Sequence, residues 1–169
     1  MIDRRMLFAS GAALAALIGW RGLAPRAEAG EKAAKTFEVT KTPEEWRKLL
    51  SKAQYHVLRE EGTEAPGSSP LLNEHRKGIF ACAGCGLPLF ASETKFESGT
   101  GWPSFYQPLD NAVGESRDNT FGMTRTEIHC RRCGGHLGHV FEDGPKPTGL
   151  RYCMNGLSLA FVPAPASAT

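Results

Sequence analysis

The sequence predicts a small, mainly β protein of short antiparallel strands, with one helix near its N-terminus and a structural zinc site. Three observations support this fold class. From Gly78 onward, glycine, proline, asparagine and aspartate recur every few residues, and the apolar stretches between them are short. Apolar residues at helical spacing follow Thr42. Four of the five cysteines form two Cys-x-x-Cys pairs, a spacing typical of tetrahedral zinc ligands.

Residues 1–29 are predicted to be a signal peptide. Arg4 and Arg5 precede an apolar run, ending at Ile18, that is too short to span a bilayer comfortably. Ala27-Glu28-Ala29 is a small-residue cleavage site. The paired arginines favour the twin-arginine export route; an ordinary secretory signal and an uncleaved membrane anchor are the alternatives. We therefore expect a periplasmic or otherwise exported protein.

Cleavage after Ala29 would leave a chain of balanced charge. It removes four of the 20 basic and two of the 18 acidic residues, leaving sixteen of each before a metal site is counted. No basic stripe then remains to track a phosphate backbone, which argues against nucleic acid as a partner. The length of 169 residues suits one folded domain with an ordinary core.

The chain after the signal begins with residues 30–41, which are charged and small and are expected to form a flexible lead. Thr42-Pro43-Glu44-Glu45 is a capping box with proline at the first helical position, and apolar residues continue at helical spacing to Leu58. Gly62 is the expected stop. One helix that covers one face of the core is therefore predicted, followed by a loop over residues 63–76.

Short strands joined by tight turns are expected through residue 162. The apolar stretches in this part are Ile79–Ala81, Leu87–Phe90, Phe121–Met123, Ile128, Val140–Phe141 and Leu157–Val162. The Ala/Pro-rich residues 163–169 are expected to form a disordered tail.

The two cysteine pairs are the strongest chemical signal. Cys82-x-x-Cys85 and Cys130-x-x-Cys133 can supply four thiolates to one Zn²⁺, which fills its tetrahedral shell and makes it structural. The 44 residues between the pairs must then fold as a β excursion that returns to the site. Two disulfides are the alternative in an oxidising compartment. Export of a protein that is already folded would allow zinc to be loaded first.

Two further groups of residues point to catalysis. His136 and His139 stand in a glycine-rich run, where a glycine between them can break the strand so that both imidazoles face one pocket. Arg151, Cys153 and Asn155 alternate, so an extended strand places them on one face. An arginine two residues from a lone thiol favours the reactive thiolate. A buried, inert cysteine is the alternative interpretation.

Together these motifs resemble the B-type peptide-methionine sulfoxide reductases, the family specific for the R epimer of the sulfoxide. The resemblance covers residues 42–162 and rests on Gly62-Thr63-Glu64, Cys82-x-x-Cys85, Pro88-Leu89-Phe90, Ser98-Gly99-Thr100-Gly101-Trp102-Pro103-Ser104-Phe105, Gly122-Met123, Arg125-Thr126-Glu127, Cys130-x-x-Cys133, His136–Phe141, Asp143-Gly144-Pro145 and Arg151-Tyr152-Cys153-x-Asn155. It implies two small antiparallel β-sheets with the helix at their edge.

The resemblance also implies the roles of the site residues. The nucleophile falls on Cys153, and Trp102 packs against the methyl group of the substrate. Two histidines lie near the sulfoxide oxygen, without an indication of which is the acid. The other active-site positions are His136, His139, Asn155, Arg151 and Asp143, and the ligands of one structural zinc are Cys82, Cys85, Cys130 and Cys133.

The implied reaction is attack of the Cys153 thiolate on the sulfoxide sulfur, which yields methionine and a sulfenic acid. The implied partners are methionine-R-sulfoxide, free or in oxidised proteins and peptides, and a thioredoxin-like reductant; a monomer is expected. Three rival classes remain: a zinc-ribbon binding module, a disulfide-stapled structural domain and a thiol peroxidase.

Three positions depart from the family pattern. Thr100 stands where many members carry a resolving cysteine, so recycling is expected to depend on an external thiol. Gly67 replaces a common phenylalanine and is expected to open one side of the pocket, and Gly156 replaces a common serine after Asn155. The last two bear on substrate preference.

Overall fold

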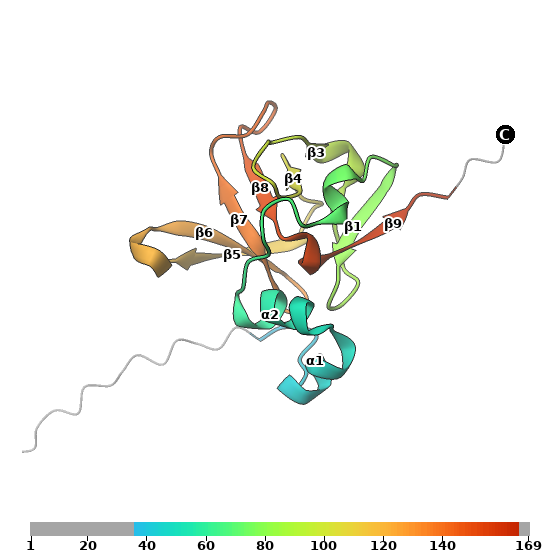
Figure 1. Cartoon of the computed structure of the whole chain (residues 1–169), viewed down its shortest axis with the longest axis vertical. Coiled ribbons are helices and arrows are strands. Elements are labelled where there is room, and N and C mark those ends of the chain that lie inside the picture. Colours follow the sequence, from blue (N-terminus) through green and yellow to red (C-terminus); the bar gives the residue numbers. More distant parts are fainter. Residues whose placement is uncertain (1–35, 166–169) are drawn as a thin grey trace, which may run out of the picture. The chain divides into compact units, whose positions relative to one another are not determined.

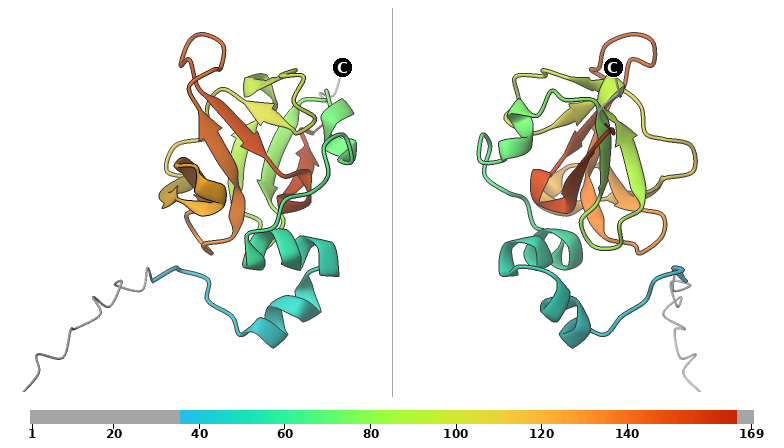
Figure 2. Two further views of the ribbon diagram at one scale, coloured as in Figure 1. Left: turned by 60° about the vertical axis from the view of Figure 1, so that its left-hand side comes forward. Right: turned by 90° about the vertical axis from the view of Figure 1, so that its right-hand side faces the viewer.

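Short strands separated by tight turns assemble into two antiparallel sheets, with two helices at one end of them (Figures 1 and 2). The structure, a computed structural model, describes residues 36–165. The predicted signal peptide lies outside the described residues. The expected mainly β class with two antiparallel sheets is confirmed. Within 36–165, no helix is both long and apolar enough to cross a membrane.

The smaller sheet has three strands in the order β2-β1-β9. Its strands are β1 (Gly78–Cys82), β2 (Pro88–Ala91) and β9 (Leu159–Pro163). Both neighbours pair with β1 in antiparallel register, and the central side chain of β1, Phe80, is fully buried. This sheet therefore contributes one wall of the core and carries the first cysteine pair at the end of β1.

The larger sheet has six strands in the order β3-β4-β8-β7-β6-β5. Their bounds are β3 (Lys95–Phe96), β4 (Ser104–Phe105), β5 (Val113–Asp118), β6 (Arg125–Cys130), β7 (His136–Phe141) and β8 (Arg151–Met154). One face of this sheet is apolar and closes the core. The buried side chains on this face include Phe105, Tyr152, Met154 and Ile128.

Two of the expected apolar stretches do not form strands as expected. Residues 121–123 lie at a 3-10 turn, Thr120–Gly122, that joins β5 to β6. The stretch 157–162 begins with another 3-10 turn, Gly156–Ser158, and becomes a strand at Leu159. In both places the tight turn that links two consecutive strands overrides the apolar composition.

Helix α1 (Pro43–Leu49) starts at the predicted capping box. The Thr42 hydroxyl accepts a hydrogen bond from the Glu45 N–H at 3.2 Å, and the Glu45 carboxylate accepts one from the Thr42 N–H at 2.8 Å. These reciprocal bonds satisfy two backbone donors that a helix start leaves free. Trp46 is the buried side chain of this helix.

The prediction of one continuous helix is wrong, because a second capping box interrupts it. Leu50 adopts extended φ/ψ angles, and Ser51 then caps α2 (Lys52–Glu60) through reciprocal bonds with Gln54. A serine followed three residues later by glutamine is a helix-start signal in its own right. The helix ends at Glu60, two residues before the expected stop, with Glu61 in the left-handed conformation.

The expected flexible lead is tied down over residues 36–41. Val39 donates its backbone N–H to the Arg132 carbonyl at 3.0 Å, and the Phe37 ring packs edge-on against His129, with ring centroids 5.7 Å apart. Glu38 pairs with Arg131. The expectation of a flexible lead was wrong for this segment because Phe37 and Val39 alternate with polar residues and pack against the protein.

The expected tail is also tied down at its start. Pro163 pairs with Gly78 as the last residue of β9, and Ala164 donates its N–H to the Lys77 carbonyl at 2.9 Å. Strand β9 therefore continues past the expected boundary at residue 162, and residues 166–169 lie outside the described part.

Candidate functional site

The two cysteine pairs form the same turn twice. In the first, the Gly86 N–H donates to the Cys82 carbonyl at 2.8 Å, and in the second the Gly134 N–H donates to the Cys130 carbonyl at 2.9 Å. Cys82 ends β1 in the smaller sheet, whereas Cys130 ends β6 in the larger sheet. The 44 intervening residues contain β2 to β5 and most of β6, as the expected β excursion requires. The four sulfurs therefore join the two sheets.

The geometry of the four sulfurs fits one tetrahedral metal ion. The four Sγ atoms lie within 4.8 Å of one another, with 3.7 Å between Cys82 and Cys133 and 3.5 Å between Cys85 and Cys130. Four sulfurs at about 2.3 Å from one zinc ion would be about 3.8 Å apart. A disulfide requires about 2.05 Å, and all five cysteines are free thiols in the structure.

The charges of the cluster point the same way. Contact with the Cys130 sulfur raises the pKa of Cys82 and lowers the pKa of Cys85. Sulfurs this close cannot all ionise without a cation, since each thiolate repels the next. The donor set, four soft sulfurs with three of them fully buried, suits Zn²⁺.

Cys153 lies apart from the cluster, in the middle of β8. Cross-strand register places it opposite Ser104 of β4 on one side and His139 of β7 on the other. The same row continues to Glu127 of β6 and Ser116 of β5. Directly opposed residues of an antiparallel sheet point to the same face, so this row forms a polar strip with the thiol within it. The thiol itself is partly exposed.

Both histidines reach this face because β7 is irregular. On β6, Ile128 pairs with Gly138 but the next residue, His129, pairs with His136. Leu137 is therefore the extra residue of a bulge in β7. This bulge brings the rings of His136 and His139 into edge-to-face contact, with centroids 5.5 Å apart. Gly138 also has to be glycine, since a Cβ there would overlap the Cys153 carbonyl of β8. The expected break of the strand is thus present.

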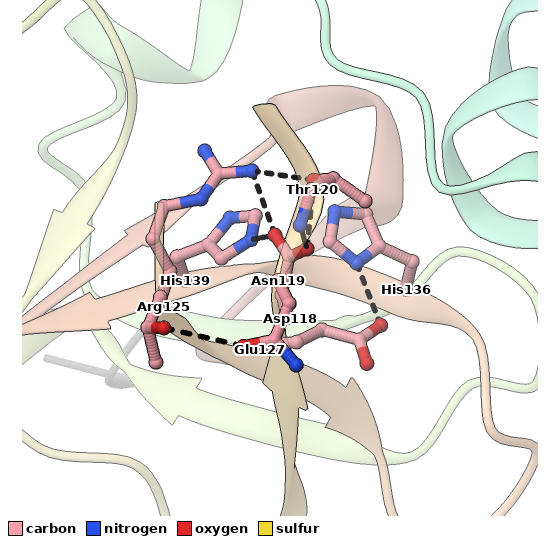
Figure 3. A network of polar contacts seen from close by, with 8 residues as sticks. Asp118, Asn119, Thr120, Arg125, Glu127, His136 and His139 are labelled. Carbon is pink, nitrogen blue, oxygen red and sulfur yellow. Dashed lines mark hydrogen bonds and ion pairs between the residues drawn. The ribbon is translucent and has the colours of Figure 1, made fainter. Parts of the chain in front are cut away.

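Each histidine is bonded to its own carboxylate (Figure 3). His136 donates from Nδ1 to Glu127 at 2.8 Å, and this contact lowers the pKa of Glu127. The Nε2 atom of His136 is buried and has no hydrogen-bond partner among the described residues. A buried ring nitrogen without a partner is unusual and marks a place for a polar ligand atom.

His139 donates from Nε2 to Asp118 at 2.8 Å. Asp118 also accepts a bond from Arg125 at 2.7 Å and is held by the backbone N–H and the hydroxyl of Thr120. Those bonds, the Thr120 N–H first, hold the pKa of Asp118 well below its usual range. Burial lowers the pKa of His139, and the bond to Asp118 acts in the opposite direction.

Arg151 is fixed beside Cys153 by a bidentate ion pair. Its Nε and Nη2 atoms donate to the two carboxylate oxygens of Asp143 at 2.9 and 2.8 Å, and its guanidinium stacks 4.5 Å from the centre of the Phe141 ring. The pKa of Arg151 is raised, first by Asp143 and also by the charge of Cys153. The guanidinium is therefore a fixed positive charge near the thiol, as the alternating pattern predicts.

Asn155 and Trp102 meet at the loop after α2. The Asn155 side chain accepts from the Glu64 N–H at 3.0 Å and donates to the Leu137 carbonyl at 3.1 Å. The Trp102 indole donates to the Glu64 carbonyl at 3.1 Å. The buried Glu64 carboxylate then accepts from the backbone of Gly156 and Leu157. One loop residue thus orients both side chains.

The three departures also find a structural setting. The hydroxyl of Thr100 lies 3.8 Å from the Cys153 sulfur, in the position expected of a resolving group. The Gly67 N–H donates to the Gly101 carbonyl at 2.8 Å, next to Trp102, and a Cβ added at Gly67 would meet open space. A Cβ at Gly156 would overlap the Ser69 hydroxyl, so the missing side chain there is matched by Ser69.

The structure places Arg151 and Cys153 on β8 as expected, but the strand ends at Met154, so Asn155 begins the following turn and does not extend the strand face. The structure also adds three residues that sequence reasoning missed. Glu127 bonds to His136, and Asp118 bonds to His139. Glu64 bonds to Asn155 and to the Trp102 indole. The sequence pattern alone assigned no role to these three acidic residues. Glu127 stands two residues from Arg125, and this alternation on a strand was the available signal for a shared face. The other two contacts depend on register between distant segments.

Comparison with known proteins identifies similar chains. The SelR domain family matches residues 50–163. The peptide methionine sulfoxide reductase MsrB of Agrobacterium fabrum is 57% identical over 127 residues, covering 75% of this chain and 94% of the relative. Proteins of the same name from Leptospira interrogans and Methanosarcina mazei are 56% and 55% identical, covering 74% and 73% of this chain and 96% and 89% of their own lengths.

Proposed function

The chain belongs to the SelR family of MsrB-type peptide methionine sulfoxide reductases, and we propose that it reduces the R epimer of methionine sulfoxide through Cys153. The observation that carries this proposal is the isolation of one thiol. Four cysteines are gathered in the cluster, and Cys153 alone lies in the polar row between His139 and Ser104. A thiolate beside a fixed guanidinium and two histidines is a suitable nucleophile.

The proposed reaction transfers one oxygen atom between two sulfurs. The Cys153 thiolate attacks the sulfoxide sulfur while His136 or His139 supplies a proton to the sulfoxide oxygen. The sulfur–oxygen bond of the substrate breaks as the oxygen passes to Cys153. The methionine sulfur is reduced by two electrons, the cysteine sulfur is oxidised by two, and the products are methionine and a Cys153 sulfenic acid.

The surrounding side chains divide the remaining work. Trp102, fixed by its bond to the Glu64 carbonyl, supplies an apolar wall for the substrate methyl group. Asn155 orients groups near the sulfur from a buried position. Arg151, anchored by Asp143, stabilises the negative charge of the thiolate.

The cluster of Cys82, Cys85, Cys130 and Cys133 is proposed to hold one structural Zn²⁺. The contacts of 3.5 and 3.7 Å between its sulfurs support this assignment over two disulfides. A bound zinc ion would supply a cross-link between the two sheets. Its shell would be filled by sulfur, which leaves the chemistry to Cys153.

Recycling is proposed to use a single cysteine of the enzyme. With Thr100 beside Cys153, the sulfenic acid awaits an external thiol, which forms a mixed disulfide and releases water. A second external thiol then frees Cys153. In an exported enzyme this reductant would be a dedicated thioredoxin-like protein, because the periplasm is kept oxidising. Export itself is proposed from the N-terminal 29 residues, and the chain is proposed to act as a monomer.

The decisive test is turnover of both sulfoxide epimers, free and in a peptide, by the purified chain with dithiothreitol. We expect reduction of the R epimer, one zinc ion per chain by elemental analysis, and one added oxygen on Cys153 after a turnover without reductant. Zinc without turnover would indicate a binding module, and peroxide consumption without sulfoxide reduction a thiol peroxidase. Four thiols that titrate only after reduction, without zinc, would indicate disulfides.

A further inference from the structure

Three hydroxyl groups run in line from the interior of the protein to the Cys153 sulfur. We infer that Ser104, Ser98 and Thr100 form a reversible hydrogen-bond relay that lets Thr100 donate to the sulfur when Cys153 is a thiolate. The relay makes Thr100 a positioning residue for the nucleophile rather than a passive substitute for a resolving cysteine. This inference rests on the proposed role of Cys153.

The distances form an unbroken chain. The Thr100 hydroxyl lies 3.8 Å from the Cys153 sulfur and 2.9 Å from the Ser98 hydroxyl. Ser98 in turn lies 2.8 Å from the Ser104 hydroxyl, which is 3.1 Å from the Trp102 carbonyl. Ser104 is almost completely buried and stands directly opposite Cys153 across the β4–β8 pairing. The strand register therefore fixes both ends of the chain.

Counting protons shows why the chain can reverse. The three hydroxyls and a neutral thiol have four protons, which fill four links in one direction: thiol to Thr100, Thr100 to Ser98, Ser98 to Ser104, and Ser104 to the Trp102 carbonyl. When the thiol loses its proton, three protons remain. Each hydroxyl can then rotate, so that Ser104 donates to Ser98, Ser98 to Thr100, and Thr100 to the thiolate.

Reversal gives the thiolate a donor without moving any heavy atom. Hydrogen bonds to a charged acceptor are stronger than those between neutral groups, so the reversed chain stabilises the thiolate more than the forward chain stabilises the thiol. The hydrogen bond lost on reversal is the one to the Trp102 backbone carbonyl, a neutral acceptor, and it is weaker than the bond gained by the thiolate. The site thereby favours the reactive form of Cys153 from the side opposite the histidines.

Other charged groups also act on this sulfur and have to be held constant in a test. The guanidinium of Arg151 faces it from β8, and the imidazole of His139 faces it from β7. Their charges are coupled to further groups on β5, β6, β7 and the loop after β7, namely Asp118, Glu127, His136 and Asp143. Substitutions confined to the hydroxyl chain leave all of these in place.

The experiment is the rate of iodoacetamide alkylation of Cys153 as a function of pH, in the zinc-loaded full chain. Thr100→Val removes the hydroxyl at nearly constant volume, and Thr100→Ser retains it. We expect the midpoint of the alkylation profile to rise by about one pH unit in Thr100→Val, because one bond to a charged sulfur is lost. It should stay near the original value in Thr100→Ser.

A second variant keeps the test valid if Thr100→Val does not fold. Ser98→Ala removes the donor behind Thr100, and we expect a smaller rise of the midpoint, because Thr100 still donates but is no longer polarised. Cys153→Ser reports the background alkylation of the clustered thiols. An unchanged midpoint in folded Thr100→Val, or in Ser98→Ala, would overturn the relay. Alkylation needs no sulfoxide, so a failure of the proposed function would appear separately, as a lack of turnover with the relay intact.

Discussion

The four clustered cysteines and Cys153 lie on the same pair of sheets, yet their positions on the backbone and their neighbours differ. Each clustered sulfur comes from a strand end or the tight turn after it and touches other sulfurs at 3.5 to 3.7 Å. Cys153 comes from the middle of an inner strand and touches a hydroxyl at 3.8 Å. The cluster joins two sheets, whereas Cys153 is flanked by strands of one sheet.

This difference shows how backbone position selects the chemistry of a thiol. A turn that follows a strand can bring two sulfurs onto one point, and two such turns complete a tetrahedron. An inner strand instead holds a single sulfur at fixed register, so that its neighbours on both sides are dictated by pairing. In this chain the neighbours are polar, and one side supplies hydroxyls while the other supplies histidines.

Replacing the isolated thiol should abolish catalysis and leave the cysteine cluster intact. We expect Cys153→Ser to lower turnover of the R sulfoxide by at least about a thousandfold, because the nucleophile is lost. Zinc content and the thermal midpoint should stay near those of the parent chain, since Cys153 is partly exposed and joins no cluster. Retention of more than a small fraction of the activity would show that Cys153 is not the nucleophile.

Replacing a clustered thiol should have the reverse effect. We expect Cys82→Ser to lower the free energy of unfolding by about 4 kcal/mol or more, since it removes a ligand from a buried site that joins the two sheets. Metal content should fall with it. Activity per folded molecule should change much less than in Cys153→Ser. Chelator treatment of the parent chain is the matched control, and it should reproduce the loss of stability.

Protonation of groups in and beside the polar row should lower the stability of the fold in acid, with His139 protonated before Glu127. The pKa of His139 is lowered by burial from 6.5, so its neutral form stabilises the fold above that pH, and this contribution is lost as the pH falls through the folded value. The pKa of Glu127 is lowered from 4.5 by His136, so its contribution is lost at still lower pH. Stability should therefore be level above pH 7 and fall in two stages below it.

Denaturant midpoints measured between about pH 2 and pH 8 test this order, because the Glu127 stage lies below its ordinary pKa. His139→Gln should flatten the first stage. Glu127→Gln should reduce the second, to which Asp118 and Asp143 also contribute because their pKa values are lowered too. A midpoint in the parent chain that stays constant down to pH 5 would contradict the assignment of the first stage to His139.

Much of this arrangement was predictable from local pattern. The Cys-x-x-Cys spacings predict the cluster because ligands three apart are positioned by one turn. The alternation of Arg151 and Cys153 predicts their shared face on β8, whereas Asn155 lies in the turn after the strand. The capping box at Thr42 predicts the start of α1 for the same reason, since all its bonds lie within four residues. Local geometry determines each of these features.

The missed features depend on segments that are far apart in sequence. Glu64 bonds to Gly156, and Asp118 bonds to His139, only because the sheet register and the loop after α2 bring them together. The second helix was missed for a different reason: apolar spacing continues across Leu50, and the cap at Ser51 is a polar signal within an apolar pattern. The packed segment 36–41 was missed because its partners lie on the second cysteine turn.

Substitution in the packed segment 36–41, which lies against the second cysteine turn, should have the smallest effect on stability of the changes considered. Residues 36–41 lie outside the part matched by the SelR family, and they cover the turn that carries Cys133. Phe37 is half-buried against His129, the neighbour of Cys130. We expect Phe37→Ala to lower the free energy of unfolding by about 1 kcal/mol, since it exposes part of one aromatic contact.

The same substitution should speed release of the metal to a competing chelator by about fivefold, because about 1 kcal/mol of local stability corresponds to that factor. Leu49→Ala is the matched control, since Leu49 is a large apolar side chain on α1 that is 59% exposed. Turnover by Cys153 should be unchanged in both variants while the metal is retained. Equal release rates in Phe37→Ala and Leu49→Ala would show that the segment rests on the turn without stabilising it.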